Sequence, residues 1–81
     1  MLSLNDITNG KFIIENISIP EIEVKALELI GIYKDMEILV LRNGYLEGSK
    51  IIKVNDNIIQ LNPYFTKNIY GSIVKEKVLT K

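Results

Sequence analysis

Met36-Glu37-Ile38-Leu39-Val40-Leu41-Arg42 and Lys50-Ile51-Ile52-Lys53-Val54 are the two stretches that decide the fold of this chain. Both are short and dominated by aliphatic side chains, and their isoleucines and valines fit the pleated surface of a strand. Alternate residues of a strand share a face, so the first stretch gathers Met36, Ile38 and Val40 on one side. The intervening residues 43–49 contain two glycines and read as the loop of a hairpin.

Further strands are predicted on both sides of this pair. Residues 11–17, 58–61 and 69–74 are rich in Ile, Val and Phe and are bounded by turn residues. Asp56-Asn57 is expected to form a tight turn, with Asp56 in the left-handed conformation that aspartate tolerates. We therefore expect a mainly β fold, a small barrel of about five strands that is closed or nearly closed.

One short helix is predicted between the first two strands, over residues 21–30. Pro20 suits a helix start, and Glu21 and Glu23 lie where the helix dipole favours negative charge. At 100° per residue one apolar face emerges, which we expect to be buried: Ile22, Ala26, Leu29 and Ile30, with Leu27 at its edge. Val24 lies away from this face and is expected to add exposed apolar surface.

Composition limits the chemistry that the chain can perform. The 81 residues allow one domain, which we place over residues 1–81, and they include neither cysteine nor histidine. The usual ligands of zinc, haem and iron–sulfur clusters are therefore missing, as is the commonest general base. The ten basic and ten acidic residues balance, with no basic stripe for nucleic acid and no apolar run of about 20 residues for direct membrane insertion. We expect a cytoplasmic protein.

No catalytic, cofactor-binding or metal-binding residue is assigned. Ser49 and Lys50 are adjacent on a predicted strand and would point to opposite faces, so they do not form a Ser–Lys pair. Glu23 and Glu28 are five residues apart on the helix, which does not bring two carboxylates together. We therefore expect the chain not to be an enzyme and to carry no cofactor.

Tyrosines in or near turns suggest a binding surface, because tyrosine is enriched at interfaces. The candidate partner-binding residues are Val24, Tyr33, Tyr45, Leu46 and Tyr64. Tyr45 is expected to be the most exposed of the tyrosines, since its loop is the longest, and Leu46 would form an apolar knob beside it. The alternative for each tyrosine is that its ring closes the small barrel. Turn or cap roles are assigned to Gly10, Gly31, Gly48 and Asp56.

The order and spacing of several short motifs resemble those of the FeoA family over roughly the whole chain. Ser3-Leu4, Asp6-Ile7 and Gly10 resemble the family's opening, and Leu27, Ile30, Gly31 and Ile32 resemble the end of its helix. Residues 36–42 match its central strand, and Leu46 and Gly48 fall in its proline-leucine-glycine loop. The chain departs from the pattern where Asp35, Glu47 and Asp56 replace glycine and where Thr66 replaces alanine.

This resemblance implies an SH3-like barrel and an accessory role in bacterial ferrous iron uptake. FeoA proteins are thought to bind and regulate FeoB, a membrane transporter with a cytosolic GTP-binding domain, so the implied partner is a FeoB-type transporter. Two alternatives stay open. One is a free-standing SH3-like interaction or regulatory domain related to the C-terminal domain of iron-dependent repressors; the other is a module that self-associates weakly.

Overall fold

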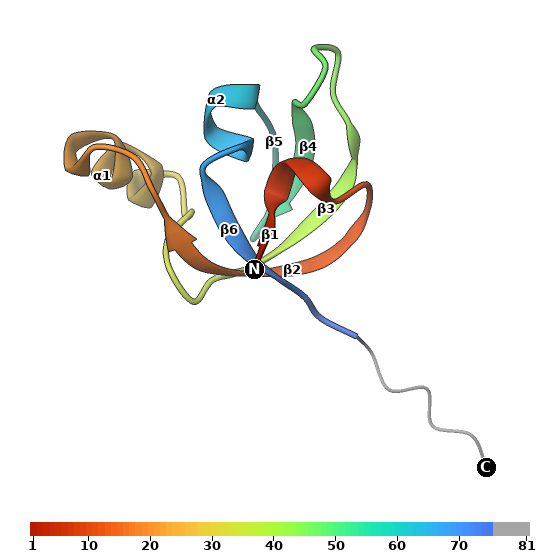
Figure 1. The fold of residues 1–81 in the computed structure, drawn as a ribbon, viewed down its shortest axis with the longest axis horizontal. Coiled ribbons are helices and arrows are strands. Elements are labelled where there is room, and N and C mark those ends of the chain that lie inside the picture. Colours follow the sequence, from red (N-terminus) through yellow and green to blue (C-terminus); the bar gives the residue numbers. More distant parts are fainter. Residues whose placement is uncertain (76–81) are drawn as a thin grey trace.

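Six strands form one antiparallel sheet in the computed structural model, which describes residues 1–75 (Figure 1). Their order across the sheet is β1-β6-β2-β3-β4-β5. Along the chain, the elements are β1 (Leu2–Ser3), the 3-10 helix η1 (Leu4–Asp6), β2 (Gly10–Ile17), α1 (Glu21–Leu29), β3 (Glu37–Asn43), β4 (Lys50–Val54), β5 (Asn57–Leu61), α2 (Pro63–Thr66) and β6 (Ile69–Ile73).

The predicted mainly β fold with one helix between the first two long strands is confirmed. The predicted strands are present as β2 to β6, and β1 is an additional two-residue strand that pairs with β6. The sheet curls around its core (Figure 1), but within residues 1–75 the ladder of paired strands ends at β1 and β5 without closing. The predicted barrel is therefore open along one side.

Two irregularities in pairing bend the long strands. β2 pairs with both β3 and β6, and its register with β6 shifts between Ile14 and Asn16; the register of β3 with β4 shifts between Val40 and Arg42. Such bulges increase local twist, which a small sheet needs in order to curl. Near the first bulge, Gly71 passes so close to the main-chain carbonyl of Ile13 that a Cβ atom would collide with it.

The core is a single cluster of buried aliphatic side chains and one phenylalanine. Strand alternation supplies most of it, as predicted for β3, where Ile38 and Val40 are buried and Met36 is half-buried. The buried hydrophobic residues are Leu4, Ile7, Phe12, Ile14, Leu27, Ile32, Ile38, Val40, Ile52, Val54, Leu61 and Ile69.

The predicted orientation of the helix is wrong. Among its residues only Leu27 is buried, whereas Ile22 is 79% and Leu29 88% exposed. The chain leaves α1 through Gly31 at φ +91°, and the amide of Ile32 donates to the carbonyl of Leu27 at 3.0 Å. Leu27 and Ile32 thus enter the core together and set the face that points inward. The expected apolar face lies on the opposite side of the helix, which stands at one end of the sheet (Figure 1).

One turn also differs from its prediction. The β4–β5 hairpin turns at Asn55-Asp56, because Val54 is paired with Asn57, and the residue with positive φ is Asn55 (54°) rather than Asp56. Asparagine tolerates the left-handed region as well as aspartate does, so either Asn55 or Asp56 could take the position with positive φ. Asp35, which stands where the FeoA pattern has glycine, adopts φ +73°.

Candidate functional site

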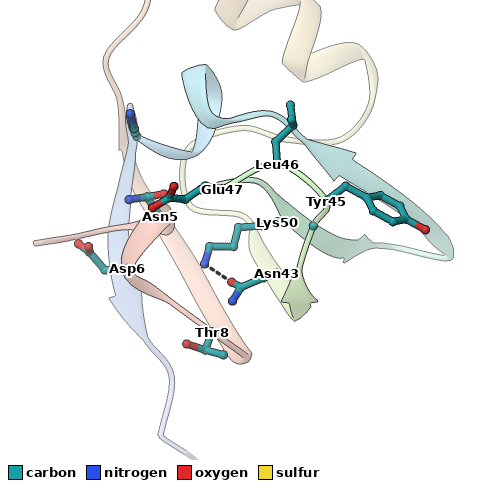
Figure 2. A pocket seen from close by; sticks show the side chains of 11 residues that line it. Asn5, Asp6, Thr8, Asn43, Tyr45, Leu46, Glu47 and Lys50 are labelled. Atoms are coloured by element: carbon teal, nitrogen blue, oxygen red, sulfur yellow. Dashed lines mark hydrogen bonds between the residues drawn. The ribbon is translucent and has the colours of Figure 1, made fainter.

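A hollow lies between η1 and the β3–β4 loop, residues 44–49. It has a volume of about 940 Å³, and its walls include Asn5, Asp6, Asn43, Glu47, Lys50 and Lys67. Figure 2 shows Lys50 extending into the space between η1 and the end of β3, with its amine directed at Asn43. The cavity is therefore a polar site formed by two segments distant in sequence.

Lys50 is the unusual residue of this cavity, because it is a lysine on the buried face of a strand. It shares that face of β4 with Ile52 and Val54 and is only 4% exposed. Its Nζ donates to Oδ1 of Asn43 at 2.6 Å. Burial lowers the pKa of the Lys50 ammonium below its usual value, and the charge of Asp6 offsets part of that effect.

A second polar group in the cavity wall is the side-chain carbonyl of Asn5. Its Oδ1 is buried and has no hydrogen-bond partner in the described part of the chain. The main chain of Gly48 lies directly against it, since a Cβ atom at Gly48 would come within 2.8 Å of Asn5 Oδ1. Gly48 has φ +86°, so both its conformation and the close approach of Asn5 require glycine there.

The β3–β4 loop is held by hydrogen bonds at both ends. The buried Ser49 hydroxyl donates to the carbonyl of Leu46 at 2.6 Å, and the amide of Gly44 donates to the carbonyl of Ser49 at 2.9 Å. From α2, the buried Thr66 hydroxyl donates to the carbonyl of Gly48 at 2.5 Å. The loop is consequently a fixed platform rather than a loose connection.

Tyr45 and Leu46 project from this platform into solvent. Tyr45 is 95% and Leu46 60% exposed, and both point away from Lys50 (Figure 2). The structure thus brings together these two of the predicted partner-binding residues, at the rim of the polar cavity.

The other three predicted partner-binding residues lie on or near the two helices. Tyr33 follows α1 and is 45% exposed, whereas Val24 is half-buried on α1. Tyr64 on α2 donates to Oε1 of Glu23 on α1 at 2.5 Å, and this hydrogen bond, together with desolvation and the Glu23 charge, raises the pKa of Tyr64. Tyr64 therefore joins the two helices. In Figure 1, α1 stands at the opposite side of the molecule from the β3–β4 loop.

The exposed side of α1 is a second apolar surface, on the helix face that was expected to be buried, with a docking surface as its alternative. We call Ile22, Ala26 and Leu29 the outer stripe of α1; all three are exposed. The signal was present in the sequence, because Val24 and Leu27 form an apolar edge on the other side of the same short helix. A helix that is apolar on two sides cannot bury both against one sheet, so one of them had to face solvent.

Neither a metal centre nor a membrane-spanning helix is found in the described part of the chain. Within residues 1–75, no three His, Cys, Asp or Glu side chains are grouped closely enough to hold a metal ion. Neither α1 nor α2 has the length and apolar character that a helix needs to cross a bilayer.

The curled sheet with its single long helix defines the class of fold as SH3-like. No family model matches the sequence, and no curated protein sequence matches it either. Among solved structures, the FeoA protein from Chlorobium tepidum superposes with a TM-score of 0.80 at 13% identity, covering 95% of this chain and 74% of that protein.

Two metal-responsive regulators contain a similar domain. The metal-dependent transcriptional regulator MtsR matches with a TM-score of 0.76 at 19% identity, and the manganese regulator SloR with 0.77 at 16%. Each match covers 89% of this chain but only 34% of the regulator. At these identities the comparisons establish a shared fold, the one common to an FeoA protein and to one domain of these regulators.

Proposed function

We propose that this chain is a single FeoA-like domain that acts in the cytoplasm as an accessory protein of bacterial ferrous iron uptake. It binds a FeoB-type transporter on its cytosolic side and regulates it, without catalysing a reaction and without a cofactor. The observation that carries the proposal is the match to an FeoA protein over 95% of this chain and 74% of that protein.

The described surface supports a role in protein binding. Tyr45 and Leu46 stand on a loop held by four hydrogen bonds, so their position is set before a partner arrives. Preorganised apolar residues lose little conformational entropy on binding, which is the usual character of an interface anchor. The outer stripe of α1 supplies a second apolar surface at the other side of the molecule.

Titration calorimetry against the cytosolic domain of a FeoB-type transporter, and a pull-down against the whole transporter, would test this proposal. We expect association at both low and physiological salt. Tyr45→Ala and Leu46→Ala should each weaken it by about 2 kcal/mol if the loop is the contact surface. Ile58→Ala is a matched control, because Ile58 is also an exposed apolar residue (65%) but lies on β5.

The outcomes separate the proposal from its rivals. Loss of binding on Leu29→Ala, with Tyr45→Ala unaffected, would move the contact surface to the outer stripe of α1. Absence of binding to the cytosolic domain and to the whole transporter, together with unchanged iron uptake in a deletion strain, would refute the accessory role.

A regulatory domain is the second candidate, favoured by the similarity to MtsR and SloR. In this case the chain would act as a free-standing SH3-like interaction domain related to the C-terminal domain of iron-dependent repressors. A gel-shift assay at low salt that detects specific retention of DNA by this chain would support it. Weak self-association through the outer stripe of α1 would instead appear in sedimentation at micromolar concentration, and Leu29→Ala would remove it.

A further inference from the structure

The cavity between η1 and the β3–β4 loop contains a buried cation, Lys50, that has no ion-pair partner among residues 1–75. An ammonium group has three donors, and Asn43 Oδ1 accepts one of them. Asp6 is the acid whose charge acts on Lys50, but it belongs to the cap of η1, where its Oδ2 accepts from the amide of Ser3 at 3.3 Å. Among residues 1–75, no carboxylate comes within 4.0 Å of the Lys50 amine.

A buried charge without an ion-pair partner is costly, and its cost falls when a ligand supplies the missing charge. Lys50 lines a cavity of about 940 Å³, which is ample for a side chain of another molecule. A metal ion does not fit this environment, because the Lys50 ammonium would repel it. The complementary ligand is therefore an anion.

The other charged residues that line the cavity indicate which class of anion fits it. Lys67 adds one positive charge, but Asp6 and Glu47 add two negative ones, so these walls together with Lys50 carry no net charge. A phosphate dianion or a polyanion would be repelled by the two acids more strongly than a single carboxylate, which carries one negative charge. Tyr45 and Leu46, exposed at the rim, offer apolar contact that a free small anion would not use.

We propose that this cavity is a carboxylate-recognition site for a protein partner. Lys50 binds the side chain of an Asp or Glu in an extended segment of the partner, and Tyr45 and Leu46 pack against an apolar residue beside it. The identity of that partner as the transporter rests on the proposed function, but recognition of the carboxylate does not.

Carboxylate recognition is tested first without any protein partner. N-acetyl-glutamate methylamide, which has one carboxylate, is titrated into 15N-labelled protein, and the amide signals of residues 43–50 are followed. We expect saturable shifts with an affinity of about 1 mM, as suits a ligand of this size. The glutamine analogue, identical in shape but uncharged, should leave these signals in place.

Variants then assign the effect to Lys50. Lys50→Met keeps the aliphatic length and removes the buried charge, and it should weaken binding of the glutamate compound at least tenfold. Lys53→Met is the matched control, because Lys53 lies on the same strand, exposed on its other face, and should bind like the unmodified protein. If Lys50→Met fails to fold, the comparison of glutamate with glutamine in the unmodified protein still decides.

Three results would overturn the proposal: equal responses to the glutamate and glutamine compounds, no response to either, or an equal response to inorganic phosphate. The same variants in the transporter assay separate this inference from the proposed function. Glutamate binding without transporter binding would leave the site standing and reject the accessory role. Transporter binding that survives Lys50→Met would support the accessory role and reject Lys50 as the residue that contacts the transporter.

Discussion

Thr66→Val removes one hydroxyl group from beneath the β3–β4 loop while preserving the shape of the side chain. In the structure this hydroxyl is fully buried and donates to the carbonyl of Gly48 at 2.5 Å, with a longer contact to the carbonyl of Pro63 at 3.3 Å. Valine has no donor, so the Gly48 carbonyl loses its partner in a position that is partly shielded from water. Leaving such a group unpaired costs about 1–3 kcal/mol.

We expect a loss of about 2 kcal/mol in the free energy of unfolding, measured by urea denaturation with an unchanged m-value. For a domain of this size the same change lowers Tm by roughly 8–16 °C. Hydrogen exchange should accelerate at the amides of Gly44 and Ser49, whose main-chain bonds close the loop, more than at those of β2.

Thr8→Val is the matched control for this substitution, because Thr8 is exposed and should change stability by less than about 0.5 kcal/mol. If Thr66→Val were as harmless as Thr8→Val, the bond to Gly48 would not hold the loop, and the description of that loop as a fixed platform would be refuted.

Three further predictions concern the sheet and the ionisable groups. Gly71→Ala should destabilise the fold by several kcal/mol in urea, because its Cβ would strike the carbonyl of Ile13, whereas Ser72→Ala on the same strand should not. The pKa of Tyr64, followed by ultraviolet absorbance, should lie above the usual tyrosine value, and Glu23→Gln should lower it. Because the folded state favours the protonated phenol, the stability that this hydrogen bond contributes is present below about pH 10 and is lost as pH rises through the raised pKa. Lys50 should change stability with pH in the opposite direction. Its pKa is lowered on folding, so the free energy of unfolding should increase as pH rises from that lowered pKa towards about 10.4, and Lys50→Met should abolish this increase.

The β framework was predictable from sequence because its signal is local. Alternating aliphatic residues such as Ile38 and Val40, or Ile52 and Val54, share one face of the sheet, and that face is buried however the sheet bends. The short strand β1 was not predicted, since two residues contain no period and are assigned only by their pairing with β6. The turn at Asn55 was displaced by one residue for a similar reason, because its position depends on which residues of β4 and β5 pair.

The orientation of α1 illustrates a different limit. Periodicity identifies apolar sides of a helix but not which of them meets the core when two compete. That choice is made by the connection after the helix, where Gly31 reverses the chain and brings Leu27 and Ile32 inward together. The larger stripe was consequently left in solvent, although a count of apolar residues favoured its burial.

Lys50 was overlooked for the converse reason. Its position at the start of β4 places it in phase with Ile52 and Val54, so the same alternation that buries those two residues also buries the lysine. In the sequence, Lys50 suggested only a pairing with Ser49, because the rest of its strand is dominated by isoleucine and valine. A charged residue in phase with a buried face requires a nearby polar group, which here is Asn43 from the paired strand β3. Because that partner is neutral and Asp6 offsets only part of the effect of burial, Lys50 has no ion-pair partner among residues 1–75, which distinguishes the site from an ordinary surface hollow.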